Sequence, residues 1–219
     1  MRLSVGLAGV GMALLAACTP QPVERSAKLP GDPARGYRIA TGNCAACHGL
    51  TGNGSGPGVP KLAGQFPDYL IKQIMAFTAK PGEKPSRISP VMGPIAAALS
   101  ATDKADIASW YAQQYRSKEE PRDPASVATG KQLFLHGNPT EGLPACASCH
   151  RPTGSGIRPD FPNLAAQNPA YVEHQLETWE SIRGHPGKLM SIIAPRLAAN
   201  ERAPLADYIA SLPPVETPP

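Results

Sequence analysis

The chain opens with an apolar segment that is followed by a polar one. Residues 3–17 are largely apolar, follow Arg2 and end in Leu-Ala-Ala before Cys18. A stretch of this length is too short to span a bilayer as a stable helix, so it predicts a signal peptide over residues 1–17. A cysteine after small residues resembles a bacterial lipoprotein processing site and predicts lipidation of Cys18, with ordinary cleavage to a free thiol as the alternative. Residues 18–31 are polar and aperiodic, which predicts a tether.

Helix-start signals divide the rest of the chain into two helical halves. Asp followed by Pro, a preferred pair at the N-cap and first helical position, opens the halves at Asp32 and Asp123. Further starts are expected at Pro67 and Pro169, with Ser100 or Thr102, and Asn200, as candidate caps of the last helices. The last helices carry apolar residues at helical spacing: Ile107, Trp110 and Tyr111 in one half, and Leu205, Tyr208 and Ile209 in the other.

These signals predict an all-α fold in two domains. The first covers residues 32–117 and the second residues 124–213, with a charged linker over 118–123 and a tail over 214–219. Aromatic residues make up only 5% of the chain, so two small domains would have thin cores. Gly and Pro together contribute 47 of the 219 residues (21 and 26), and they gather in loops between the helices. A bound cofactor is therefore expected to complete each core.

The two halves repeat one another. At an offset of 102, residues 44–75 align without a gap to residues 146–177, with 15 identities in 32 positions. Identity of this extent indicates an internal duplication. The net charge of +4 comes from basic residues spread along the chain, with no Lys/Arg run longer than two, which argues against nucleic acid as a partner.

Four of the five cysteines lie in two C-x-x-C-H motifs, the attachment signature of c-type haem. Two thiols on one helical turn can each bond to a haem vinyl group, and the next His then lies under the iron as its proximal ligand. A thioredoxin-like pair, a zinc site or a disulfide are the alternatives, but a redox pair needs no following His. The motifs predict two covalent haem c groups, held by Cys44 and Cys47 with His48, and by Cys146 and Cys149 with His150.

The expected distal iron ligand is a methionine that recurs in both halves. Met92 and Met190 match when the offset becomes 98, and a thioether is the usual distal ligand of an electron-transfer cytochrome c. Met75 aligns with a Glu and lies in a helical pattern, so it is expected to be a core residue. The remaining histidines lack a counterpart in the other half and are expected at the surface or in loops, with His185 the strongest alternative ligand: His136, His174 and His185.

The combination of C-x-x-C-H, a Gly-rich loop, P-x-L-A-G-Q, a late Met and a terminal helix resembles the cytochrome c4 family over about residues 32–213. The resemblance implies two tandem class I cytochrome c domains whose haem propionates meet near the contact between them. It also places near that contact, or near the propionates, Gln65, Tyr69 and Gln73 with Gln167, Tyr171 and Gln175. It further implies a Pro60 or Pro162 carbonyl bound to the proximal His. The chain departs from the pattern after the second motif, at Arg151, and at Ala166.

Methionine on both irons would leave no open position for a substrate, so the sequence predicts an electron carrier and not an enzyme. We expect it to work in a bacterial periplasmic respiratory chain, between a quinol-oxidising complex or dehydrogenase and a terminal oxidase or other acceptor. A dihaem peroxidase, a sulfur-compound oxidising enzyme or a haem subunit of a dehydrogenase complex are the alternatives. Lipid on Cys18 would hold the protein at a membrane. The residue after Cys18 is Thr19 and not Asp, which favours the outer membrane.

Overall fold

The computed structural model describes residues 29–79, 82–183 and 189–215. The predicted signal peptide, Cys18 and His185 lie outside these residues. Within them the fold is helical, and β-structure is limited to two isolated bridges. The expected all-α fold is therefore confirmed. None of the described helices has the length and apolar character needed to cross a membrane.

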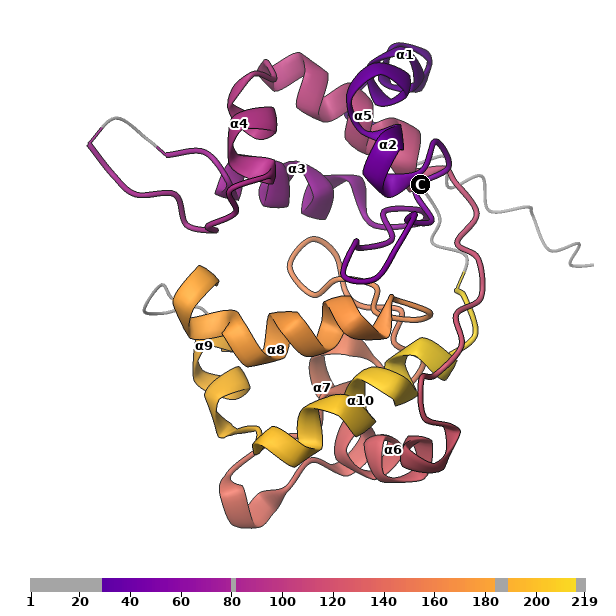
Figure 1. Cartoon of the computed structure of the whole chain (residues 1–219), viewed down its shortest axis with the longest axis vertical. Coiled ribbons are helices and arrows are strands. Elements are labelled where there is room, and N and C mark those ends of the chain that lie inside the picture. The colour runs from indigo at the N-terminus through magenta and orange to yellow at the C-terminus, as the bar shows by residue number, and fades with distance from the viewer. Residues whose placement is uncertain (1–28, 80–81, 184–188, 216–219) are drawn as a thin grey trace, which may run out of the picture.

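The helices form two groups, one above the other in Figure 1. The first half contains α1 (Pro33–Asn43), α2 (Ala45–His48), α3 (Pro67–Ala76), α4 (Met92–Ala97) and α5 (Ala101–Ala112). The second half contains η1 (Pro124–Ser126), α6 (Val127–His136), η2 (Pro139–Glu141), α7 (Ala147–His150), α8 (Pro169–Arg183), α9 (Leu189–Ile193), η3 (Ala194–Arg196) and α10 (Ala199–Ser211). The segment between α5 and η1 runs down one side of both groups.

Most of the expected helix starts are confirmed by their caps. The Asp32 carboxylate accepts the Ala34 N–H at 2.8 Å, and the Asp123 carboxylate accepts the Ala125 N–H at 3.0 Å. Ser100 caps α5, where its hydroxyl accepts the Asp103 N–H at 3.1 Å. The expectation that Asn200 caps the last helix is wrong. Helix α10 begins at Ala199, with Ala198 at its N-cap, two residues before Asn200. The Glu201 carboxylate accepts the Ala198 N–H at 2.9 Å.

Each half packs its first long helix against its last one. Close packing of α1 on α5 and of α6 on α10 depends on glycine, because a Cβ on Gly36 or Gly130 would lie 2.1 Å or 1.9 Å from a backbone oxygen of the facing helix. Buried apolar side chains form one cluster per half, which in the first half also includes Leu70 of α3: Ala40, Leu70, Ile107, Ala108 and Tyr111 in the first, and Leu133, Phe134, Leu205, Ala206 and Ile209 among others in the second. The first cluster is small, as the scarcity of aromatic residues predicts.

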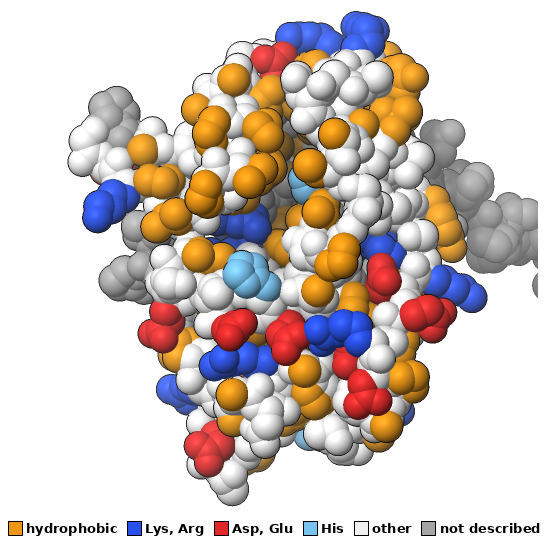
Figure 2. Space-filling model, viewed as in Figure 1, with side chains coloured by type: hydrophobic (Ala, Val, Ile, Leu, Met, Phe, Trp, Pro, Cys, Tyr) orange, Lys and Arg blue, Asp and Glu red, His pale blue; other side chains and the backbone are white. Residues whose placement is uncertain are grey.

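On the face seen in Figure 2, the surface differs between the halves. In the view of Figure 2, apolar side chains gather on the upper half, around a hollow, whereas charged side chains of both signs spread over the lower half. Exposed large apolar side chains of the first half are Tyr37, Met75, Ile88, Val91 and Tyr115. Met75 is 57% exposed, so the expectation that it is a core residue is wrong. Leu70 is the residue of the same helix that is buried in the core cluster.

Candidate cofactor sites

Each C-x-x-C-H motif forms a single helical turn that buries its histidine. The His48 N–H donates to the Cys44 carbonyl at 2.9 Å, and the His150 N–H donates to the Cys146 carbonyl at 2.9 Å. These bonds place the two cysteines of each motif and the histidine around one turn, in α2 and α7. Both imidazoles are 8% exposed. The backbone thus gives the two motifs the same arrangement in both halves.

A backbone carbonyl fixes the orientation of each imidazole. Nδ1 of His48 lies 3.1 Å from the Pro60 carbonyl oxygen, and Nδ1 of His150 lies 3.1 Å from that of Pro162. A carbonyl oxygen only accepts hydrogen bonds, so Nδ1 carries the proton and Nε2 keeps its lone pair. Burial lowers the pKa of both histidines, which favours the neutral ring that a metal requires. The contact expected from Pro60 and Pro162 is confirmed.

The cysteines do not fit the alternative chemistries. None of the four forms a disulfide, and the described residues contain no group of three metal-binding side chains that would make a zinc site. Burial raises the pKa of the Cys44 thiol, and it raises that of Cys146 to about 11. The first cysteine of a redox-active pair works as a thiolate of lowered pKa, whereas the pKa of Cys44 and that of Cys146 are raised. Covalent attachment of haem remains the chemistry that the motifs fit.

The two methionines predicted as distal ligands occupy equivalent places in the helical order. Met92 begins α4, where its N–H donates to the Ser89 hydroxyl at 3.1 Å, and Met190 lies in α9; both are half-buried. A pocket of about 360 Å³ lies between the end of α1 and α4, next to the first motif and to the helix of Met92. Its lining consists of Asn43, Pro94, Ile95, Ala98 and Leu99. His136 and His174 are exposed, as expected.

The two departures from the repeat preserve the backbone conformation. Arg151 has φ 63° where its counterpart Gly49 has φ 72°, and Ala166 has φ 53° where Gly64 has φ 60°. Residues with a side chain adopt this left-handed region only at an energetic cost. The second half therefore keeps the turn after its motif and the turn before α8 without the glycines that favour them.

A buried pair of arginines lies where the halves meet. Arg87, from the loop after α3, and Arg183, from the end of α8, are 9% and 6% exposed. Both guanidinium groups donate to the Gln73 amide oxygen and to the Tyr171 hydroxyl, at 3.0 to 3.2 Å, and Arg87 also donates to Gln175 at 3.2 Å. Burial alone would raise the pKa of Tyr171, but the two cations lower it.

This arginine pair fits a cofactor that carries acidic groups. Neither side chain forms an ion pair with an Asp or Glu of the described residues, and Nε of Arg183 is buried without a hydrogen-bond partner. Two unpaired buried cations are costly, so an anion is expected beside them. Haem propionates would supply that anion. The sequence marked Gln73, Tyr171 and Gln175 through the repeat, but it gave no signal for Arg87 or Arg183.

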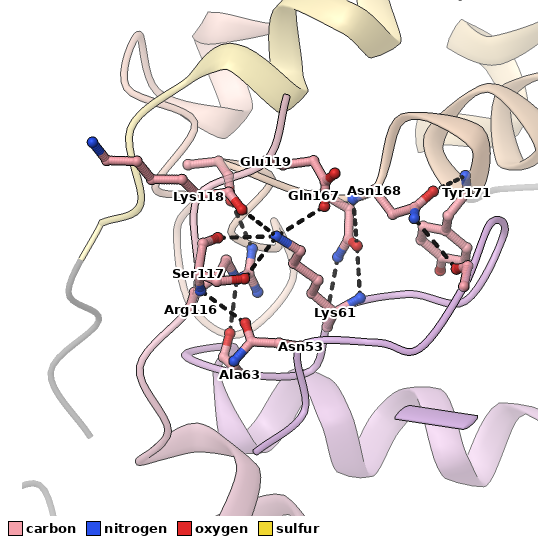
Figure 3. A network of polar contacts seen from close by, with 12 residues as sticks. Asn53, Lys61, Ala63, Arg116, Ser117, Lys118, Glu119, Gln167, Asn168 and Tyr171 are labelled. Atoms are coloured by element: carbon pink, nitrogen blue, oxygen red, sulfur yellow. Dashed lines mark hydrogen bonds and ion pairs between the residues drawn. The ribbon is translucent and has the colours of Figure 1, made fainter. Parts of the chain in front are cut away.

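Polar contacts join the halves around the residues that follow Pro60 and Pro162 (Figure 3). Fully buried Arg116 donates to the carbonyls of Ala63, Asn163 and Ala165 at 2.7 to 3.1 Å, and burial lowers its pKa to about 10. The Lys61 ammonium donates to the Ser117 and Lys118 carbonyls and pairs with Glu119 at 2.9 Å. The segment after α5 is thereby fixed to the contact between the halves.

The side chains of Gln65 and Gln167 complete this contact in a reciprocal way. Gln167 accepts from the Lys61 N–H at 2.7 Å and donates to the Lys61 carbonyl at 2.9 Å. Gln65 accepts from the Asn163 N–H at 3.0 Å and donates to the Asn163 carbonyl at 2.9 Å. The two glutamines are equivalent in the repeat, as are Lys61 and Asn163, so the halves meet with approximate twofold symmetry.

The helical fold, the two C-x-x-C-H turns and the oriented, neutral imidazoles define a c-type cytochrome with two haem sites. The family model described as Cytochrome c matches residues 33–114. Cytochrome c4 of Thiocapsa roseopersicina is 37% identical over 86% of this chain and 97% of its own length. A thiosulfate dehydrogenase electron acceptor from Thiomonas intermedia is 34% identical over 78% of this chain and 79% of its own.

A solved structure agrees with these sequence comparisons. The crystal structure of reduced recombinant cytochrome c4 from Pseudomonas stutzeri matches with a TM-score of 0.75 and 34% identity, over 83% of this chain and 99% of that chain. The chain belongs to the cytochrome c4 family. It is an electron-transfer protein with two covalently bound haem c groups and not an enzyme, which sets aside the peroxidase and sulfur-oxidising alternatives.

Proposed function

We propose that the chain carries electrons in the periplasm of a bacterium, from a quinol-oxidising complex or a dehydrogenase to a terminal oxidase or another acceptor. The observation that carries this proposal is the repeated site: a buried imidazole on each C-x-x-C-H turn, held by a carbonyl, with a methionine on the equivalent helix later in each half, α4 or α9. An electron enters and leaves such a site without a change of ligand. The bound haem supplies a one-electron couple whose potential the axial ligands set.

We assign each side chain a role in this carrier. Cys44 and Cys47 would hold the first haem and Cys146 and Cys149 the second, by thioether bonds. His48 with Met92, and His150 with Met190, would be the axial ligands. The protein's own work is to orient the imidazoles through the Pro60 and Pro162 carbonyls, to exclude water from the rings, and to balance the propionates with Arg87 and Arg183.

Single ligand variants test the assignment. Met92→His and Met190→His replace a sulfur donor with a nitrogen donor, and each should lower the potential of one haem only, because thioether ligation raises it. Reduced-minus-oxidised spectra recorded during a redox titration would resolve the two steps. A variant that leaves both steps unchanged would exclude that methionine as a ligand.

A thiosulfate-oxidising enzyme is the donor that one relative favours, because that protein is described as the electron acceptor of thiosulfate dehydrogenase. Stopped-flow mixing of the oxidised cytochrome with thiosulfate and purified thiosulfate dehydrogenase tests this donor. Rapid reduction of both haems supports it. Reduction no faster than that of an unrelated c-type cytochrome of similar potential excludes it.

The lipid anchor rests on the sequence around Cys18. We propose that residues 1–17 are removed and that the new N-terminal cysteine is lipidated, which would hold the carrier at the outer membrane. Mass spectrometry of the mature protein should find Cys18 at the N-terminus with added acyl chains. Cys18→Ser should release the protein from the membrane fraction, whereas an unmodified Cys18 would contradict the proposal.

A further inference from the structure

The peptide group between Pro60 and Lys61 is bound on both of its edges. Its carbonyl oxygen accepts from Nδ1 of His48 at 3.1 Å, and its N–H donates to Oε1 of Gln167, in the other half, at 2.7 Å. One peptide group therefore stands between the proximal imidazole of the first half and a side chain of the second. The order of groups is imidazole N–H, peptide, amide oxygen.

The second half contains the mirror arrangement. The Pro162–Asn163 peptide accepts from Nδ1 of His150 at 3.1 Å, and its N–H donates to Oε1 of Gln65 at 3.0 Å. Each proximal histidine is thus linked through a single peptide group to a glutamine of the opposite half. We call these two chains of hydrogen bonds the crossed relays.

Burial makes the crossed relays effective. Gln65, Lys61, Gln167 and Asn163 are 4%, 4%, 5% and 1% exposed, so bulk water does not compete for these groups. Each glutamine is also held by its Nε2, which donates to the carbonyl of the same residue whose N–H it accepts, at 2.9 Å. The amide oxygen therefore has a fixed direction. In such surroundings a chain of hydrogen bonds polarises each of its members.

We propose that Gln65 and Gln167 are positioning residues that set the reduction potential of the haem in the opposite half. By accepting the peptide N–H, the glutamine makes the carbonyl at the other edge of that peptide a stronger acceptor for the imidazole N–H. The imidazole becomes a stronger donor through Nε2, and a more basic ligand stabilises the oxidised iron. Each potential then depends on the correct contact between the halves.

This inference rests on the proposed roles of His48 and His150 as proximal ligands. It goes beyond them because it assigns the control of each haem to a residue of the other half. Contact between the halves would act on both electron-transfer centres without any direct contact between the cofactor and the glutamine.

Gln167→Met and Gln65→Met test the crossed relays in the holoprotein. Met has a similar length and fills the same space without accepting the peptide N–H. Haem-methyl NMR signals followed during a redox titration report each haem separately. Cooperative strengthening of 10–30% per bond is expected to change the equilibrium constant for reduction about twofold, which corresponds to about 18 mV at 59 mV per tenfold. The potential should rise in each variant.

The crossed pattern is the decisive readout, and each variant is the control for the other. Gln167→Met should shift the haem on Cys44 and Cys47, and Gln65→Met should shift the haem on Cys146 and Cys149. Equal shifts of both haems in both variants would indicate a loosened contact and overturn the proposal, as would no shift at all.

A measurement on the unmodified holoprotein covers the case in which the variants do not fold. The amide protons of Lys61 and Asn163 should be protected from hydrogen exchange until the halves separate, and fast exchange of either would overturn the crossed relay that contains it. Loss of histidine–methionine ligation in the unmodified ferric protein would instead contradict the proposed function. The two failures are therefore distinguishable.

Discussion

Gly36 lies where α1 crosses α5, and replacing it with Ala should destabilise the first half. An added Cβ would lie 2.1 Å from the Asp106 carbonyl oxygen and 2.9 Å from Cβ of Trp110. Both neighbours belong to α5, and the nearer one is a backbone atom at its middle. Gly42 lies on the same helix, is exposed, and has nothing within 4 Å of a Cβ built on it. It therefore provides a matched control for the same substitution.

The magnitude follows from the contacts between the helices. Ordinary contact begins near 3.4 Å, so α1 and α5 must separate by about 1.3 Å at Gly36. Overpacking of this kind costs about 1–3 kcal/mol. Separation also strains the hydrogen bond that the Asp32 N–H donates to the Asp106 carboxylate at 2.7 Å, whose loss costs about 1 kcal/mol of stability. Better helix propensity returns about 0.5–1 kcal/mol, so the net loss in the free energy of unfolding is roughly 1–3.5 kcal/mol.

Equilibrium guanidinium unfolding of the holoprotein, followed by circular dichroism and by haem absorbance, measures the difference. Gly42→Ala should gain about 0.5–1 kcal/mol, since it relieves the entropic cost of glycine in a helix. Gly36→Ala should lose stability in the transition of the first half. Equal behaviour of the two variants would refute the argument that glycine is required for the close approach of α1 and α5.

Two further predictions concern charge. Arg87→Gln should lower the reduction potential of at least one haem in a redox titration, because it removes a buried positive charge that opposes oxidation. The same change at exposed Arg38 should have little effect, since solvent and salt screen an exposed charge. Equal shifts in the two variants would exclude the role of Arg87. Hydrogen bonds from the side chain and backbone of Ser100 lower the pKa of Asp103. The contribution of Asp103 to stability is complete above its unfolded pKa, near 3.8, and is lost as the pH falls through its lower pKa in the folded protein. Asp103→Asn should therefore reduce the loss of stability with falling pH, measured by unfolding at a series of acidic pH values. An unchanged pH dependence would contradict this.

Local signals in the sequence predicted the local parts of the structure. The Asp-Pro pairs predicted the caps at Asp32 and Asp123, because a cap is satisfied within two or three residues of the chain. The two motifs predicted the helical turns that bury His48 and His150 for the same reason. Periodicity alone placed Met75 in the core wrongly, since a short helix with apolar residues on several sides does not reveal which side will be covered.

Contacts between the halves could not be read from the sequence. The repeat and the family resemblance marked Gln65 and Gln167 as residues near the contact or the propionates, but neither identified their partners, which lie about a hundred residues away in the chain. Arg87 comes from a loop rich in Gly and Pro, and nothing nearby in the sequence points to Arg183. Long-range polar pairs of this kind depend on how two folded halves meet, which local propensity does not encode.

The absorption spectrum of the ferric holoprotein, normalised to haem per chain, tests the central claim most directly. Two haems per chain and a weak long-wavelength charge-transfer band of two-site strength would show methionine sulfur on both irons, in agreement with Met92 and Met190 as ligands and with a carrier of electrons. A band of half strength, or its absence together with high-spin features, would show an open or differently ligated iron and would contradict the account.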